Sequence, residues 1–240
     1  MLSPNYILHQ CNHNVLWMSS VLFRESEKSF CVGKILCLGR NYVAHAREMN
    51  SAIPEFPVIF LKPATALIHD NENVVIPRFS TTMHHEVEMV VVIGKRAKNV
   101  RIEDAYDCVE GYAVGLDMTL RDIQDEAKKK GLPWTVAKGF ETSAPLSSAV
   151  DRATIGDPHI LDLTLKVNGQ TRQKSNTKYM IFKIDFVVSY LSSIFTLEPG
   201  DLVFTGTPEG VGQVHAGDIL EAELESVGTL RVGVVNDFVQ

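Results

Sequence analysis

The segment His84-His85-Glu86-Val87-Glu88-Met89-Val90-Val91-Val92-Ile93 carries the strongest structural signal in the sequence. Its run of apolar residues is typical of a buried β-strand. Because side chains alternate along a strand, Glu86 and Glu88 project from the same face. Two neighbouring carboxylates in an apolar strand repel each other and lose solvation unless a cation lies between them. The alternative is an edge strand whose glutamates both face water.

A second predicted strand, 112–117, ends in a single carboxylate, Asp117, after an apolar run. Pairing of the two strands would place Asp117 beside Glu86 and Glu88. Three oxygen ligands with open positions suit Mg²⁺ or Mn²⁺. Zinc is disfavoured because no cysteine or histidine cluster has the required spacing. The alternative role for Asp117 is to cap a helix that starts near Thr119.

The rest of the chain predicts a mainly β protein of the α+β type, folded as a roll or sandwich. Asn168-Gly169 is typical of the type I′ turn of a β-hairpin, because both central residues of that turn need positive φ. Further strands are predicted at 34–38, 58–61, 74–76, 161–167, 201–205 and 219–235 with a turn at Gly228, and helices at 42–49, 119–130 and 182–195.

Length and composition indicate an ordinary globular protein. The chain has 240 residues, of which 45% are hydrophobic and 22% charged. One catalytic domain over residues 31–240 is the simplest organisation, with residues 1–30 as an appendage, a strand or hairpin packed on it. The 23 basic residues against 29 acidic ones give a net charge of −6, which argues against nucleic acid as a partner.

Hydropathy and cysteine spacing bear on localisation. No apolar run approaches the roughly 20 residues that cross a bilayer, so we expect no membrane association. The four cysteines form no C-x-x-C pair, and Cys37 lies in an apolar run where it is interpreted as a core residue. We therefore expect a reducing, cytoplasmic compartment.

The segment 39–48 contains a candidate acid–base pair. His45 and Glu48 are three residues apart and so share one face of the predicted helix. A carboxylate in that position can orient an imidazole and raise its basicity, which is an arrangement able to activate water. The alternative is a surface His–Glu pair on a mobile helix.

Four other side chains are candidates for substrate contact. Lys138 follows an apolar stretch, so its ammonium can neutralise a developing enolate or oxyanion, or it is a surface lysine. Arg121 and Gln124 share a helical face just after Asp117, where they can bind a substrate carboxylate. Thr207 lies in the glycine-rich loop 204–212, which lacks the pattern of a nucleotide-binding loop but can hold an anionic group.

Taken together, these residues resemble the fumarylacetoacetate hydrolase superfamily, and more narrowly its small acylpyruvases and oxaloacetate decarboxylase/tautomerases. The likeness extends from about residue 34 to 235. It is carried by six ordered motifs: G-R-N-Y-x-x-H-x-x-E (39–48), F-L-K-P (60–63), H-H-E-x-E (84–88), L-D-M-T-x-R-D-x-Q (116–124), K-K-G-L-P-W-x-x-A-K (129–138) and T-G-T-P-x-G-V-G (205–212).

The resemblance implies the β-roll or β-sandwich of that superfamily, assembled as a homodimer, with short helices. It implies Mg²⁺, or sometimes Mn²⁺, on three carboxylates, a water-activating dyad, an oxyanion-stabilising lysine and a small 2-oxo acid as substrate. The matching residues are Glu86, Glu88 and Asp117 for the metal, His45, Glu48 and Lys138 for catalysis, and Arg121, Gln124 and Thr207 for substrate.

The activity expected first from this resemblance is metal-dependent C–C hydrolysis of acylpyruvates to a carboxylate and pyruvate. The alternative is an oxaloacetate tautomerase or decarboxylase, or a 2-hydroxyhepta-2,4-diene-1,7-dioate isomerase-type enzyme. In each case a 2-oxo acid can chelate the cation, which acts as a Lewis acid where enolate charge develops. A non-enzymatic scaffold that binds Ca²⁺ or an anion is the remaining interpretation.

Overall fold

A computed structural model describes residues 19–24, 26–49 and 52–237. Residues 1–18 of the predicted appendage lie outside the described residues. The described part of that segment forms a hairpin, in which β1 (Ser20–Leu22) pairs antiparallel with β2 (Ser29–Cys31). The hairpin packs on the body of the protein, because the buried Phe23 ring contacts Phe30 and Ala149 exchanges backbone hydrogen bonds with Leu22 and Arg24.

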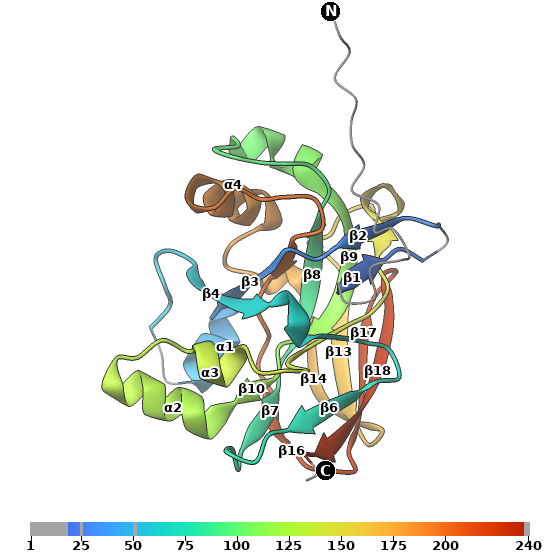
Figure 1. The fold of residues 1–240 in the computed structure, drawn as a ribbon. Coiled ribbons are helices and arrows are strands. Elements are labelled where there is room, and N and C mark those ends of the chain that lie inside the picture. The colour runs from blue at the N-terminus through green and yellow to red at the C-terminus, as the bar shows by residue number, and fades with distance from the viewer. Residues whose placement is uncertain (1–18, 25, 50–51, 238–240) are drawn as a thin grey trace, which may run out of the picture.

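The largest sheet has eight strands, with the apolar residues 87–93 near its centre (Figure 1). β8 (Val87–Ile93) lies between β15 (Leu202–Phe204) and β9 (Val109–Leu116), and every residue of β8 is buried. The interpretation of an edge strand with solvated glutamates is therefore wrong. The remaining strands are β4 (Val58–Pro63), β3 (Lys34–Gly39), β11 (Ala144–Leu146), β5 (Leu67–His69) and β12 (Val150–Asp151).

A five-stranded sheet packs against one face of the large sheet. Its order is β14 (Gln170–Asn176), β13 (Asp162–Val167), β17 (Ile219–Leu224), β18 (Gly228–Asn236) and β6 (Asn73–Ile76). The predicted hairpin joins β13 to β14, with φ of 51° at Asn168 and 75° at Gly169, as a type I′ turn requires. The strands are mostly antiparallel and the helices are short, which confirms the predicted mainly β roll or sandwich.

The two faces of β8 belong to different apolar layers. Val87, Met89 and Val91 join the core shared with the five-stranded sheet. Val90 and Val92 face a second core, to which β3, β15 and the N-terminal hairpin contribute. Since side chains alternate, Glu88 projects on the same side as Val90, away from the five-stranded sheet.

The predicted strand 85–93 is interrupted at Glu86. β7 (Met83–His85) belongs to a separate three-stranded sheet, between β10 (Thr119–Leu120) and β16 (Gly212–Val214). The backbone therefore passes from one sheet to another at Glu86. Hydrophobic periodicity does not report such a switch, because both halves remain buried.

The helices α1 (Val43–Glu48), α2 (Arg121–Lys130) and α3 (Thr135–Lys138) lie together on one side of the molecule, apart from α4 (Ile184–Ile194) (Figure 1). α3 was not predicted. The 3₁₀ turns are η1 (Ala64–Ala66), η2 (Ile102–Cys108), η3 (Arg152–Thr154) and η4 (Thr177–Tyr179). No helix in the described ranges is long and apolar enough to cross a membrane.

The predicted helix 119–130 begins two residues later than expected, because Thr119 and Leu120 form β10. Thr119 lies in β10, and its hydroxyl donates to the Asp117 carbonyl oxygen at 3.0 Å instead of capping the helix. Asp117 does not cap α2 either, because no side-chain hydrogen bond caps this end. The predicted end at residue 130 is confirmed, and Gly131, with φ of 66° in the left-handed region, follows the last residue of the helix.

Asp122 anchors the first turn of α2 to the preceding loop. Its carboxylate accepts hydrogen bonds from the Ser80 hydroxyl at 2.7 Å and the Thr81 amide at 2.8 Å. Partial burial favours the protonated form, but the hydrogen bonds from Thr81 and Ser80 outweigh it and lower the pKa of Asp122. The carboxylate therefore stabilises the fold above its unfolded pKa, and this contribution is lost as the pH falls through the lower folded pKa.

We expect Asp122→Asn to lower the free energy of unfolding at pH 7 by about 1 kcal/mol, through weakened hydrogen bonds to a charged acceptor. The deficit should shrink as the pH is lowered from 5 to 3, because the wild-type carboxyl is then protonated. Urea unfolding across this range measures both effects, with Asp125→Asn on the exposed side of the same helix as the control. A deficit independent of pH would contradict the assignment.

Candidate active site and metal centre

Three carboxylates meet where β8 and β9 pair. Glu88 lies opposite Gly115 in the antiparallel register, and the Asp117 amide donates to the Glu86 carbonyl oxygen at 2.8 Å. One carboxylate oxygen from each of Glu86, Glu88 and Asp117 lies within 4.8 Å of the others. The strand pairing thus brings together the three residues that the sequence singled out, at one end of the central sheet.

Buried cations surround this cluster. The Lys138 ammonium donates to Glu86 Oε2 at 2.7 Å and to Asp117 Oδ2 at 2.6 Å. Lys62 Nζ lies 2.8 Å from Asp117 Oδ1, and the Arg121 guanidinium donates to Glu86 Oε1. Lys62 and Lys138 are only 1% and 2% exposed. Lys138 is therefore not a surface lysine, and Lys62 is a site residue that the sequence analysis did not assign.

Glu88 is less well compensated than its neighbours. Its Oε2 accepts a hydrogen bond from the Gly206 amide at 2.7 Å. Burial, together with the charges of Asp117 and Glu86, raises the pKa of Glu88 well above its usual value. At Glu86 burial acts in the same direction, but the Lys138 charge outweighs it and the pKa of Glu86 is lowered.

The cluster fits a divalent cation. Asp117 Oδ1 is buried and accepts no hydrogen bond, although Lys62 lies in ion-pair range, so this oxygen retains an unused lone pair. Among the residues that the structure describes, Glu88 forms no ion pair, and its burial beside two acids is unfavourable without a cation. Three carboxylate oxygens are hard ligands of the kind that Mg²⁺ and Mn²⁺ take. These residues can therefore hold a divalent metal.

α2 brings two predicted substrate contacts to the same place. Arg121 Nη1 donates to Gln124 Oε1 at 2.5 Å, so the two side chains share one helical face as their spacing predicts. Arg121 Nε also donates to His84 Nδ1 at 3.3 Å. Burial and the Arg121 charge lower the pKa of His84 to about 4, which keeps this imidazole neutral at physiological pH.

The predicted His45–Glu48 pair is present on α1. His45 Nδ1 lies 3.2 Å from Glu48 Oε2, and His45 is 6% exposed. Glu48 Oε1 accepts a hydrogen bond from the Gly210 amide at 2.9 Å, which ties α1 to the glycine-rich loop. The buried position of His45 removes the interpretation of a surface pair, while the role of the pair in catalysis remains a prediction.

Gln173 on β14 forms hydrogen bonds with several residues around the site. Its Oε1 accepts from the Val87 amide at 3.1 Å and lies 3.0 Å from His85 Nδ1. Its Nε2 donates to the Pro208 carbonyl oxygen and to Thr207 Oγ1, both at 2.9 Å. Because Thr207 accepts this bond, its own hydroxyl proton can be donated elsewhere. The sequence shows Gln173 only as one more polar residue of an exposed hairpin strand.

These residues line one small cavity. His45, Glu86, Glu88, Lys138 and Thr207 contribute to its wall, together with Arg121 and Gln124. All nine predicted site residues lie at this place, with Asp117 just beneath the wall and Glu48 behind His45.

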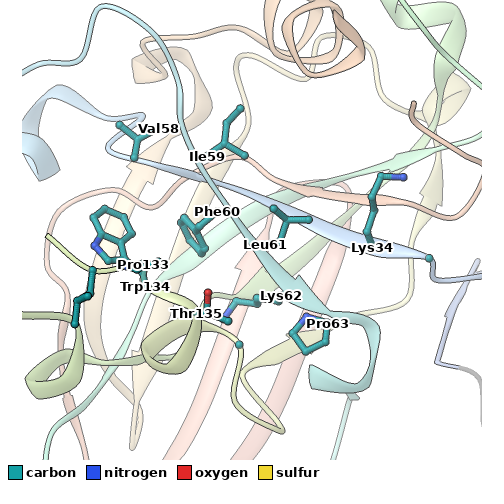
Figure 2. A pocket seen from close by; sticks show the side chains of 13 residues that line it. Lys34, Val58, Ile59, Phe60, Leu61, Lys62, Pro63, Pro133, Trp134 and Thr135 are labelled. Atoms are coloured by element: carbon teal, nitrogen blue, oxygen red, sulfur yellow. The ribbon is translucent and has the colours of Figure 1, made fainter. Parts of the chain in front are cut away.

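A larger open groove of about 670 Å³ runs along β4 (Figure 2). Figure 2 shows its lining by residues of β4 and the segment that leads into α3. Phe60 and Trp134 line both the groove and the small cavity, with ring centroids 5.9 Å apart. His45, Glu86 and Glu88 line the cavity, whereas the ionisable side chains that line the groove are Lys34 and Lys62. The cavity, and not the groove, is therefore the candidate active site.

Comparisons with known proteins agree with this geometry. Residues 34–235 match the family model described as fumarylacetoacetate (FAA) hydrolase C-terminal. The bovine protein named oxaloacetate tautomerase FAHD1, mitochondrial, is 51% identical over 200 residues, which cover 83% of this chain and 90% of that protein. The Arabidopsis thaliana protein of the same name is 49% identical over 201 residues, 84% of this chain and 90% of that protein.

Solved structures extend the likeness to the fold. Fumarylpyruvate hydrolase from Pseudomonas aeruginosa, in complex with Mn²⁺ and pyruvate, is 39% identical with a TM-score of 0.89, over 94% of this chain and 100% of that one. 2-Hydroxyhepta-2,4-diene-1,7-dioate isomerase from Mycobacterium marinum is 35% identical with a TM-score of 0.77. The match covers 89% of this chain and 83% of that one. The chain therefore belongs to the fumarylacetoacetate hydrolase family.

Proposed function

We propose that this protein is a metal-dependent enzyme that forms enolates of 2-oxo acids, and that its reaction is the keto–enol tautomerisation of oxaloacetate. The observation that carries the proposal is the buried cluster of Glu86, Glu88 and Asp117 with the Lys138 ammonium bonded between two of them. Such a cluster concentrates positive charge, once a cation is bound, where an enolate oxygen would develop.

Magnesium is the metal we propose, with manganese as an alternative. Glu86, Glu88 and Asp117 would hold it, leaving positions open for substrate oxygens. When bound, the cation supplies Lewis acidity to the carboxylate and 2-oxo group of the substrate. The Mn²⁺ and pyruvate in the Pseudomonas fumarylpyruvate hydrolase structure support this choice of ligand and substrate class.

The chain's own residues bind and orient the substrate. Arg121 and Gln124 offer donors for the substrate carboxylate from one face of α2. The hydroxyl of Thr207, which accepts from Gln173, is set to donate its proton to a substrate oxygen. Lys138 holds a positive charge beside the carboxylates proposed to bind the metal. This charge stabilises the negative charge that develops during enolisation.

Proton transfer is assigned to His45. The imidazole removes a proton from C3 of the substrate, and the resulting imidazolium gives that proton to the 2-oxo oxygen, so that the enol forms and His45 returns to its neutral state. The reverse sequence restores the keto form. Glu48 orients the ring through its 3.2 Å contact with Nδ1. Relatives about 50% identical to this chain are named oxaloacetate tautomerases, which supports this reaction.

Hydrolysis of acylpyruvates is the second candidate. In that reaction His45 would activate water for attack on the distal carbonyl carbon, and cleavage of the C–C bond would release a carboxylate and pyruvate. The intact His45–Glu48 pair and the fumarylpyruvate hydrolase relative favour it. We rank it below tautomerisation, reversing the order expected from the sequence, because the relatives named tautomerase are more similar to this chain.

Asp117→Asn should strongly lower Mg²⁺-dependent tautomerisation without unfolding the protein. We expect kcat/KM for oxaloacetate to fall on the order of 100-fold, the loss typical of removing one main electrostatic contributor. Enol absorbance follows the reaction, and calorimetry follows Mg²⁺ binding. Glu126→Gln, on the exposed side of α2, is the control. Full activity or unchanged Mg²⁺ affinity in Asp117→Asn would remove the metal assignment.

His45→Ala separates the two candidate reactions. If His45 moves substrate protons, the variant should lose oxaloacetate tautomerisation and acetylpyruvate hydrolysis to similar extents, each by roughly 100-fold or more. If His45 only activates water, pyruvate release from acetylpyruvate should collapse while tautomerisation persists. Both assays are run on the same Mg²⁺-loaded preparation, so persistence of tautomerisation would remove His45 from the proton-transfer role.

Gln173 is expected to act through Thr207. Gln173→Leu and Thr207→Val should each lower kcat/KM by about tenfold, since each removes a buried hydrogen bond worth on the order of 1 kcal/mol. The double variant should lose no more than the worse single variant, because the two groups act as one unit. Gln170→Leu, at an exposed position of the same strand, is the control. Losses that multiply in the double variant would show that Gln173 and Thr207 act independently, and would contradict the assignment.

A further inference from the structure

Two cations lie at the mouth of the cavity and have no part in the chemistry described above. Arg40, from the loop after β3, and Lys128, from the last turns of α2, both line the cavity together with Trp134. Both are half-buried, whereas Gln124 and Lys138 farther in are 3% and 2% exposed. The cavity therefore passes from a buried polar floor to a positively charged rim.

Arg40 is held in an unfavourable backbone conformation. Its φ is 61°, in the left-handed region that non-glycine residues rarely adopt. The next residue, Asn41, is locked in place: its side-chain amide donates to the Thr205 carbonyl oxygen at 2.7 Å and accepts from the Phe182 amide at 2.7 Å. Strain that the surrounding structure maintains in this way is concentrated at functional sites.

Arg40 also lacks a protein partner. No ion pair or hydrogen bond of its guanidinium occurs within the part of the chain that the structure describes. A guanidinium on a cavity wall, on a strained backbone and without an acid beside it, is available to an anionic ligand. Its planar donors match a carboxylate in two hydrogen bonds.

Lys128 faces the same space. Its Nζ lies 5.6 Å from the centre of the Trp134 ring and 3.6 Å from Asp125 Oδ1. Burial and the charges of Arg121 and Arg40 lower the pKa of Lys128, and the exposed Asp125 offsets this only in part. The two rim cations thus repel each other, and an anion between them would relieve that repulsion.

The charge balance of the floor indicates how much negative charge a ligand must bring. Three buried carboxylates face three buried cations there, so the floor is neutral by itself and carries two positive charges once a divalent metal is bound. The proximal carboxylate of a 2-oxo acid supplies one negative charge. The rim adds two further cations, and the exposed Asp125 offsets only part of their charge, so positive charge remains for a second carboxylate. The floor groups are Glu86, Glu88 and Asp117 against Lys62, Arg121 and Lys138.

We propose that Arg40 and Lys128 bind the distal carboxylate of the substrate, so that the enzyme selects 2-oxo dicarboxylates over 2-oxo acids with an uncharged distal end. The inference rests on the proposed function, because it takes the 2-oxo carboxylate group to bind on the cavity floor. It applies equally to oxaloacetate and to an acylpyruvate whose acyl chain ends in a carboxylate. Trp134 forms the apolar side of this subsite and limits the access of water to the ion pairs.

The test compares two ligands that differ only at the distal end. Oxaloacetate carries a carboxylate where 2-oxobutyrate carries a methyl group. Affinities of both are measured with the Mg²⁺-loaded full-length protein, by calorimetry for 2-oxobutyrate and by KM and competition for oxaloacetate. The variants are Arg40→Gln and Lys128→Gln. Lys129→Gln removes the same charge from the same helix at an exposed position away from the cavity.

We expect each rim variant to weaken oxaloacetate binding by about tenfold, as for loss of a charge-assisted hydrogen bond. Binding of 2-oxobutyrate should change less than twofold, and Lys129→Gln should leave the ratio of the two affinities unchanged. Arg40→Lys and Lys128→Arg keep the charge and should restore most of the preference. Unchanged binding of 2-oxobutyrate shows that a rim variant with weakened oxaloacetate binding is still folded.

Two results would overturn the proposal. An equal loss of affinity for both ligands would show that the rim residues support the fold and do not bind the distal carboxylate. An equal loss in Lys129→Gln would show only a long-range effect of net charge. Failure of the proposed function looks different: the wild-type protein would bind oxaloacetate with the predicted preference but would not interconvert its keto and enol forms.

Discussion

The contact on which the site depends is the buried ion pair of Lys138 with Glu86 and Asp117. Charges removed from water must be compensated in place, and loss of one partner leaves the others strongly unfavourable. Lys138 lies at the end of α3, Glu86 at the switch between two sheets, and Asp117 just after β9. Folding therefore joins three distant segments at one point, and a divalent cation would complete the compensation that Glu88 still lacks.

Sequence reasoning succeeded where a local rule determines position. Alternation along a strand placed Glu86 and Glu88 on one side, and the hairpin turn at Asn168-Gly169 followed from its need for positive φ. It failed where tertiary contacts determine whether a residue is buried or which element it joins. Gln173 and Lys62 are polar residues whose burial depends on distant partners. The start of α2 was misplaced because Thr119 pairs with the neighbouring strand β7.

α2 links the floor of the cavity to its rim. Arg121, Gln124 and Lys128 recur at spacings of three and four residues and so form one stripe along the helix. The first two are buried beside Glu86 and the third is half-buried at the mouth. In the proposed binding mode, this one helix would present donors to the reacting end of the ligand and a cation to its far end, at a separation that the helical pitch sets. The anchoring of its first turn by Asp122 supports both functions.

The glycine-rich loop 204–212 connects parts of the site that are otherwise independent. The Gly206 amide contacts Glu88, Thr207 lines the cavity, and the Gly210 amide contacts Glu48. A shift of this loop would displace the Glu88 carboxylate and the His45–Glu48 pair in the same movement. A substitution that moves the loop is therefore expected to disturb the carboxylate cluster and this pair together, whereas a substitution of Arg40 or Lys128 leaves both of the loop's contacts in place.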